Sequence, residues 1–131
     1  MHNGRTSMFL GLVATFALTC LPSALLAQTT FPNKPITLLV GSAAGGSNDI
    51  FARAIGKQLQ TALGVAVVVE NKPAAGGILA NMLLAKAPAD GYTLVVLSST
   101  FTTGAAIRTN LPYDAQTSFA PIAMLAKGPL L

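Results

Sequence analysis

Residues 41–49, GSAAGGSND, decide the fold because they separate two segments with different hydrophobic patterns. The segment before them, ITLLV (36–40), is short and continuously apolar, which predicts a buried strand. In the segment after them, 48–63, apolar residues recur every three or four positions, which predicts an amphipathic helix. A loop of glycine, alanine and serine between a strand and a helix leaves its backbone open to the approach of another group.

The predicted helix has a defined apolar face and two candidate ends. We expect Ser47 or Asn48 to cap its start and Gly64 to follow its end. The side chains expected on the buried face are Ile50, Phe51, Ala54, Ile55, Leu59, Ala62 and Leu63.

The same alternation continues along the chain. A continuously apolar run over 65–70 predicts a second strand covered on both faces, and 78–87 predicts a second helix. Residues 93–100 predict a third strand that ends in hydroxyl side chains, and 101–119 a loop with a short helix. The apolar segment 120–131 is interpreted as a further strand. The order strand–helix–strand–helix–strand predicts an α/β fold, doubly wound around a mostly parallel sheet with right-handed crossovers.

The first 27 residues have the layout of a secretory signal peptide. Arg5 precedes an apolar stretch from Met8 to Leu18, and Pro22 and the small residue Ala27 follow it. An uncleaved membrane anchor is the alternative, although the apolar stretch is short for a helix that spans a bilayer.

Cys20 raises a second alternative, a lipoprotein cysteine, but the residues around it match that motif poorly. With Cys20 assigned to the signal peptide, residues 28–131 contain no cysteine for a disulfide, a thiolate metal site or cysteine catalysis.

Composition and motifs argue against several classes of protein. The net charge is +4 and the basic residues are scattered, which gives no support to nucleic-acid binding. The loop 41–49 does not fit the dinucleotide fingerprint, and the P-loop and nucleophile-elbow motifs are absent. The only histidine is His2, and the four carboxylates form no acid–base pair. We therefore predict a protein that is not an enzyme and that uses no cofactor.

Ligands of open α/β sheets bind at the carboxyl ends of the strands, in the loops that lead into the helices. Here those loops are 41–48, 71–77 and 98–104, and all three are rich in Gly, Ala, Ser or Thr. Their backbone N–H groups and the adjoining helix N-termini favour a carboxylate or a phosphate.

Several separated motifs now identify a resemblance. The blocks FPNKPITLLV, AAGGSNDIFAR, VVENKPAAGG, DGYTL and LPYDAQTSFAPI, in this order, resemble the Bug-type extracytoplasmic receptors of tripartite tricarboxylate transporters. The similarity runs from about Phe31 to the end of the chain. It implies a type II periplasmic-binding fold with two lobes, roughly two to three times as long as this chain.

The family places these receptors in the periplasm, as expected monomers that hand a small organic acid to membrane permease subunits. By this resemblance, 28–120 is the N-terminal part of the first lobe, and 121–131 begins the crossover toward a second lobe, so the sequence is interpreted as truncated. Two other functions stay open. One is the first part of an α/β enzyme whose catalytic residues lie in a C-terminal half, and the other is a non-functional remnant of a receptor gene.

The resemblance implies that the three loops form the ligand site, and we expect Gly45, Gly46 and Ser99 to be the main contacts. The expected ligand-binding residues are Ser42, Ala43, Ala44, Gly45, Gly46, Ser47, Asp49, Ala75, Gly76, Gly77, Ser98, Ser99 and Thr100. Structural interpretations compete with this one: Asp49 could only pair with Arg53, and the glycines could only permit tight packing. Gly41 and Ser42 stand where family members often carry proline and an aromatic residue, so one wall of the expected cleft differs.

Overall fold

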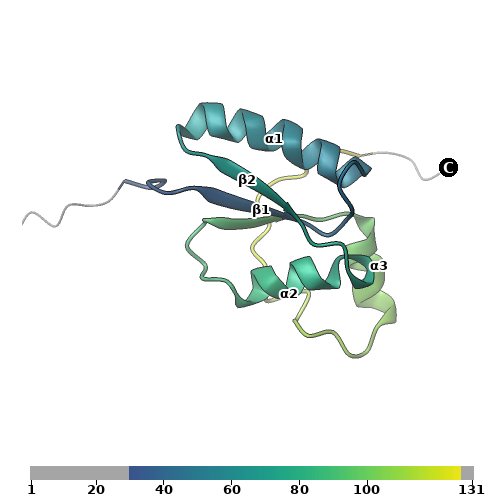
Figure 1. Ribbon diagram of the computed structural model, residues 1–131. Coiled ribbons are helices and arrows are strands. Elements are labelled where there is room, and N and C mark those ends of the chain that lie inside the picture. Colours follow the sequence, from purple (N-terminus) through teal and green to yellow (C-terminus); the bar gives the residue numbers. More distant parts are fainter. Residues whose placement is uncertain (1–29, 128–131) are drawn as a thin grey trace, which may run out of the picture.

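The computed structural model describes residues 30–127 and shows a parallel sheet between two helices (Figure 1). The predicted signal peptide, 1–27, lies outside the described residues, as do 128–131. The elements in chain order are β1 (Ile36–Val40), α1 (Ser47–Leu63), β2 (Val67–Asn71), the short 3₁₀-helix η1 (Ala75–Gly77), α2 (Ile78–Lys86), β3 (Thr93–Val96) and α3 (Ser99–Ile107).

The three strands lie in the order β2-β1-β3, and both neighbours of β1 run parallel to it. Ile36 stands opposite Val67, and Thr37 stands opposite Thr93. The amino ends of the three strands therefore lie together, and so do their carboxyl ends. Each connection crosses over through a helix, as parallel pairing requires. The predicted strand–helix alternation and parallel sheet are confirmed.

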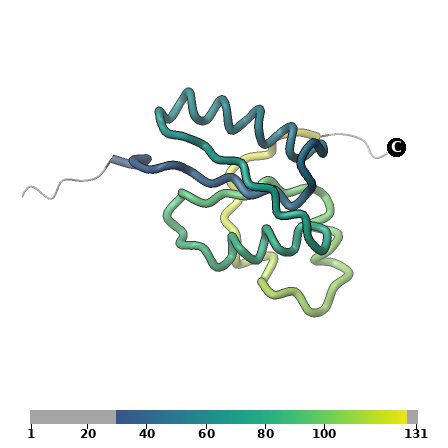
Figure 2. The backbone as a smooth tube through the Cα atoms, in the orientation of Figure 1, coloured from purple at the N-terminus to yellow at the C-terminus, as the bar shows by residue number. Residues whose placement is uncertain are grey.

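The helices divide the two faces of the sheet between them. Helix α1 packs on β1 and β2, whereas α2 packs on β1 and β3 from the opposite face (Figures 1 and 2). The central strand is therefore the most buried element, with Ile36, Leu38, Leu39 and Val40 at most 4% exposed. Leu38, Val40, Ala52 and Val96 form the core cluster.

Helix α1 packs through small side chains, so its predicted apolar face is wrong for most of its residues, and only Ile55 and Leu59 of that face are half-buried. The buried residues of α1 are Asp49, Ala52 and Gly56, whereas Ile50 is 62% and Phe51 48% exposed. A Cβ at Gly56 would lie 3.5 Å from side-chain atoms of both Val67 and Val69. Small residues let the helix approach the sheet closely, and this close approach turns the larger apolar side chains toward the rim.

Strand β2 is less covered than its apolar sequence predicts. It occupies an edge of the sheet, and Val68, on the α2 side of the sheet, is 47% exposed because α2 packs mainly on β1 and β3. The prediction of a strand covered on both faces is therefore wrong for β2. Its ladder also starts later than expected, at Val67, because Val65 and Ala66 complete the turn after the left-handed Gly64.

The third strand stops at Val96, not Thr100, because the hydroxyl residues enter a helix. Ser98 has extended backbone angles and is the N-cap of α3. Ser and Thr are favoured at helix starts because their hydroxyls can bond to nearby backbone groups. The short helix expected within 101–119 is thus confirmed but begins earlier, at Ser99.

The apolar segment after Ala120 forms no strand within the described residues. Residues 120–127 are exposed and pair with no strand of the described chain. An apolar run becomes a strand only where a neighbour satisfies its backbone N–H and C=O groups. Figure 2 shows this segment passing from the level of α2 back to the level of α1.

No helix within residues 30–127 has the length and hydrophobicity needed to cross a bilayer.

The close approach of α1 to the sheet gives a test at Gly56. Alanine fits there, because its Cβ would make contacts of 3.5 Å or longer. Gly56→Ala should therefore raise the free energy of unfolding by about 0.5–1 kcal/mol, the helix penalty of glycine. Gly56→Leu should lower it, because the longer side chain must push α1 away from Val67 and Val69. Chemical denaturation measures both, and a destabilised alanine variant would refute this packing.

Candidate functional site

The three connections after the strands meet at the carboxyl edge of the sheet. Val40, Asn71 and Val96 are the last residues of β1, β2 and β3, and the parallel register brings them to the same edge. We call the segments 41–47, 72–77 and 97–100 together the loop cradle. The chain places here all the predicted ligand-binding residues except Asp49, which lies directly beneath.

The first and second segments of the loop cradle touch through their backbones. A Cβ at Gly41 would lie 2.6 Å from the Cα of Gly77, a distance that no real side chain tolerates. Gly76 and Gly77 have φ of 69° and 93°, and Gly45 has φ of 82°, in the left-handed region that favours glycine. The glycines therefore have two structural roles. Gly41 and Gly77 allow the close contact between the loops, and Gly45, Gly76 and Gly77 allow the tight turns.

Asp49 is the centre of a hydrogen-bond network beneath the loop cradle. Its side chain is almost completely buried, with the residue 3% exposed. Oδ2 accepts hydrogen bonds from the Gly45 N–H (2.8 Å) and from Arg53 Nε (3.0 Å). Oδ1 accepts one from Asn71 Nδ2 (2.9 Å). The expected ion pair of Asp49 with Arg53 is confirmed, and it belongs to a larger network.

Asn71 links the first loop to the end of β2. Its Nδ2 also donates to the backbone carbonyl of Ser42 (3.1 Å), and its Oδ1 accepts from Arg53 Nη2 (3.1 Å). The sequence reasoning missed this residue. Asn71 directly follows the second apolar run, at the carboxyl end where ligands bind, and this position could have identified it as a site residue.

The network keeps Asp49 ionised. The hydrogen bond from Arg53, followed by those from the Gly45 N–H and from Asn71, lowers the pKa of Asp49 from 3.8 to about 2, although burial opposes this shift. A carboxylate with these three partners is fully engaged with protein groups. Asp49 therefore fixes the shape of the first loop from below, and its expected contact with a ligand stays a prediction.

All three helices that begin at the loop cradle lack a side-chain cap. Their N-caps are Gly46, Gly77 and Ser98, and none makes a side-chain hydrogen bond to its helix. The prediction that Ser47 or Asn48 caps α1 is wrong, because Asp49 reaches back to Gly45 and shifts the cap to Gly46. The first N–H groups of a helix have no partner within it and carry partial positive charge. Three such groups of donors therefore face one edge of the sheet.

The predicted site residues differ in their exposure. Ala43, Ala44, Gly45, Ser47, Ala75, Gly76, Ser99 and Thr100 are exposed, Ser42, Gly46 and Ser98 half-buried, and Gly77 is buried in its contact with Gly41. Packing of η1 against α3 brings the second and third segments together. The Ser98 and Thr100 hydroxyls are 2.7 Å apart, whereas the buried Ser42 Oγ has no hydrogen-bond partner.

The described residues hold no cluster of three or more His, Cys, Asp or Glu side chains that could bind a metal ion. Two of the other carboxylates form exposed ion pairs, Glu70 with Lys72 and Asp90 with Lys34. Because Lys72 of the loop cradle is paired with Glu70, what the cradle offers a ligand is mainly backbone N–H groups and hydroxyls.

Comparison with known proteins identifies relatives of this chain. The family profile of the tripartite tricarboxylate transporter family receptor matches residues 51–131. Protein BugT of Bordetella pertussis is 35% identical over 124 residues, a match that covers 93% of this chain and 38% of BugT. The structure of periplasmic binding protein BugD is similar with a TM-score of 0.67 and 38% identity, over 70% of this chain and 31% of BugD.

A third relative has a ligand in its structure. MatC from Rhodopseudomonas palustris, solved with bound malate, is similar with a TM-score of 0.64 and 34% identity, over 72% of this chain and 33% of MatC. The chain thus spans between 31% and 38% of the length of these three proteins. The expected family and the α/β periplasmic-binding fold class are confirmed.

The low pKa of Asp49 predicts a specific pH dependence. A carboxylate with a pKa lowered in the folded state contributes stability that is complete above its unfolded value of 3.8 and is lost as pH falls toward about 2. The melting temperature of Asp49→Asn should therefore lie below that of the wild type by a constant amount at pH 5 to 7, and this gap should shrink below about pH 4. Thermal unfolding monitored by circular dichroism measures it.

Asp90 and Asp114 also have lowered pKa values, held down mainly by backbone N–H groups. Both residues remain in the wild type and in the variant, so their titration cancels in the difference. A gap between the two proteins that stays constant down to pH 2 would contradict the role given to the Asp49 network.

Proposed function

The chain belongs to the tripartite tricarboxylate transporter receptor family, and from that membership we propose that the protein is a solute-binding receptor for a small organic carboxylate. We propose that it works in the periplasm, because its relative BugD is a periplasmic binding protein. The receptor would deliver its solute to the membrane permease of a tripartite transporter.

One observation carries the proposal: three helices without side-chain caps begin at the loop cradle. Their free N–H groups suit the oxygens of an anion, and backbone N–H groups cannot lose this character by titration. The malate bound to MatC is a carboxylate of the expected class.

The Asp49 network supports this arrangement. A buried, ionised carboxylate beneath the loop would repel an anion if its charge were uncompensated, but Arg53 neutralises it at 3.0 Å. The network thereby holds the donors of the first loop in place and leaves the loop cradle without net negative charge.

Binding without covalent chemistry is the simplest use of these groups. The carboxylates of the described chain are bound to protein groups, and none faces another across the loop cradle. We therefore propose a receptor and no catalytic step.

The test is thermal unfolding with malate, and the chain offers a matched pair of variants. Gly45 and Gly64 have φ of 82° and 70°, and a Cβ at either would meet nothing within 4 Å. Alanine should strain both backbones similarly, by about 1 kcal/mol. Only Gly45 belongs to the loop cradle, since Gly64 lies at the far end of α1.

Malate should raise the melting temperature of the wild type, because a ligand that binds only the folded state stabilises it by about 2.7 kcal/mol at one hundred times Kd. Gly64→Ala should keep this response, and Gly45→Ala should lose most of it. No shift with malate or with a panel of other di- and tricarboxylates would refute the proposed function. Equal responses of the two variants would refute the loop cradle as the site.

A further inference from the structure

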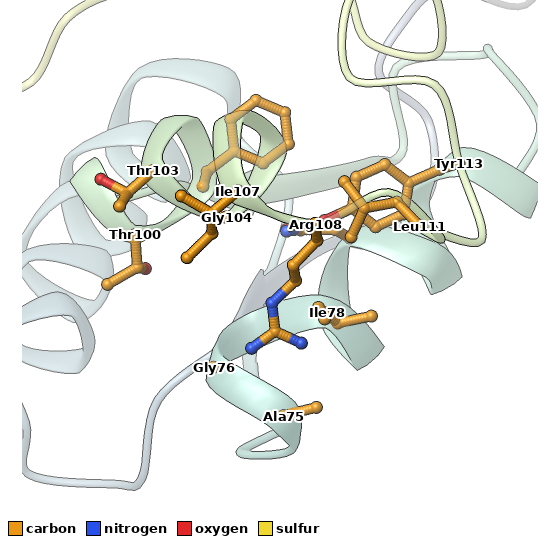
Figure 3. Close-up of a pocket in the computed structure, with 12 residues that line it drawn as sticks. Ala75, Gly76, Ile78, Thr100, Thr103, Gly104, Ile107, Arg108, Leu111 and Tyr113 are labelled. Atoms are coloured by element: carbon orange, nitrogen blue, oxygen red, sulfur yellow. Dashed lines mark hydrogen bonds between the residues drawn. The ribbon is translucent and has the colours of Figure 1, made fainter.

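A hollow of about 220 Å³ adjoins the loop cradle. It lies between α3, η1, the start of α2 and the segment that follows α3 (Figure 3). Ala75, Gly76 and Thr100 belong both to the loop cradle and to the lining of the hollow, so the two are continuous. We call it the Arg108 hollow. Its volume is below the roughly 300–1,000 Å³ of pockets for drug-sized ligands, which suits a small acid.

Aliphatic and aromatic side chains make up much of the lining of the hollow, and Arg108 is its only charged residue. Ile78 of α2, Ile107 of α3 and Leu111 provide aliphatic walls. Arg108, the residue at the end of α3, extends across the hollow, and its guanidinium lies near Gly76 and Ile78 (Figure 3). The side chain thus carries a positive charge from α3 to the beginning of α2.

A buried polar contact holds another part of the lining. Asn81 is 5% exposed, and its Nδ2 donates to the Tyr113 hydroxyl (3.1 Å). Tyr113 also stacks with Phe101, with ring centroids 6.1 Å apart. These contacts join α2, α3 and the segment after α3, so the hollow is built by packed side chains.

No acidic residue of this chain remains to neutralise Arg108. The sequence contains four acidic side chains. Each already has a partner: Asp49 with Arg53, Glu70 with Lys72, Asp90 with Lys34, and Asp114 with the backbone N–H groups of Gln116 and Thr117. None of the ion pairs within residues 30–127 includes Arg108.

We propose that Arg108 binds a second carboxylate of the solute, and that the aliphatic walls hold the hydrocarbon chain between its two carboxylates. This inference rests on the proposed function, with the first carboxylate in the loop cradle. Guanidinium presents its N–H donors in a planar fork that matches a carboxylate. The preferred solute is then a dicarboxylate with a hydrocarbon spacer, and Arg108 distinguishes it from the corresponding monocarboxylate.

The experiment compares glutarate with pentanoate, which have equal carbon number and differ by one carboxylate. Calorimetry should give the wild type a Kd for glutarate about 10- to 100-fold lower than for pentanoate, the range expected for a charge-assisted hydrogen bond. Arg108→Gln should abolish this preference, so that the Kd values for the two acids become similar. Lys86→Gln is the matched control: it removes an exposed positive charge at the other end of α2 and should keep the preference.

The outcomes separate the two proposals. A preference for glutarate that persists in Arg108→Gln, or a wild type that binds the two acids equally, overturns the role of Arg108 and leaves the proposed function standing. A wild type that binds neither malate, glutarate nor pentanoate overturns the proposed function, and the role of Arg108 falls with it.

Discussion

The hydrogen bonds of the buried Asp49 carboxylate connect the parts of this structure that matter for binding. They join three parts of the chain to Asp49. The Gly45 N–H belongs to the first loop, Arg53 to α1, and Asn71 to the end of β2. A buried charge is costly unless it is paired and hydrogen-bonded, so the groups around Asp49 must stay in place while the carboxylate is ionised. The position of the first loop therefore depends on the charge of one side chain.

Backbone contacts, together with the Asp49 network, assemble the three loops of the cradle. The contact of Gly41 with Gly77 brings the first and second loops together, and packing of η1 on α3 adds the third. No side chain caps α1, because Asp49 bonds to the Gly45 N–H outside the helix, and this leaves the N–H groups of the first turn facing the carboxyl ends of the strands. A site made of backbone donors needs side chains that do not block the approach of a ligand, and the small residues of the loop cradle meet this need.

Local patterns in the sequence were sufficient for the architecture. Apolar runs and glycine loops predict the three strands, the helices and the edge at which the loops meet, and the family motifs predict the fold class. The buried face of α1 could not be predicted from periodicity, because packing favours the small Ala52 and Gly56 over the larger Ile50 and Phe51. Arg108 was also missed, since its hollow is assembled from segments that are far apart in the sequence.

The most direct test of the account follows the backbone N–H groups of the loop cradle themselves. In a ¹⁵N-labelled sample titrated with malate, nuclear magnetic resonance should show the largest shifts for the amides of residues 43–47, 75–79 and 98–101. The same amides of Asp49→Asn should respond at higher malate concentrations, because their loop is no longer held from below. Shifts confined to other parts of the chain, or an Asp49→Asn variant that responds like the wild type, would contradict the claim that Asp49 organises a carboxylate site.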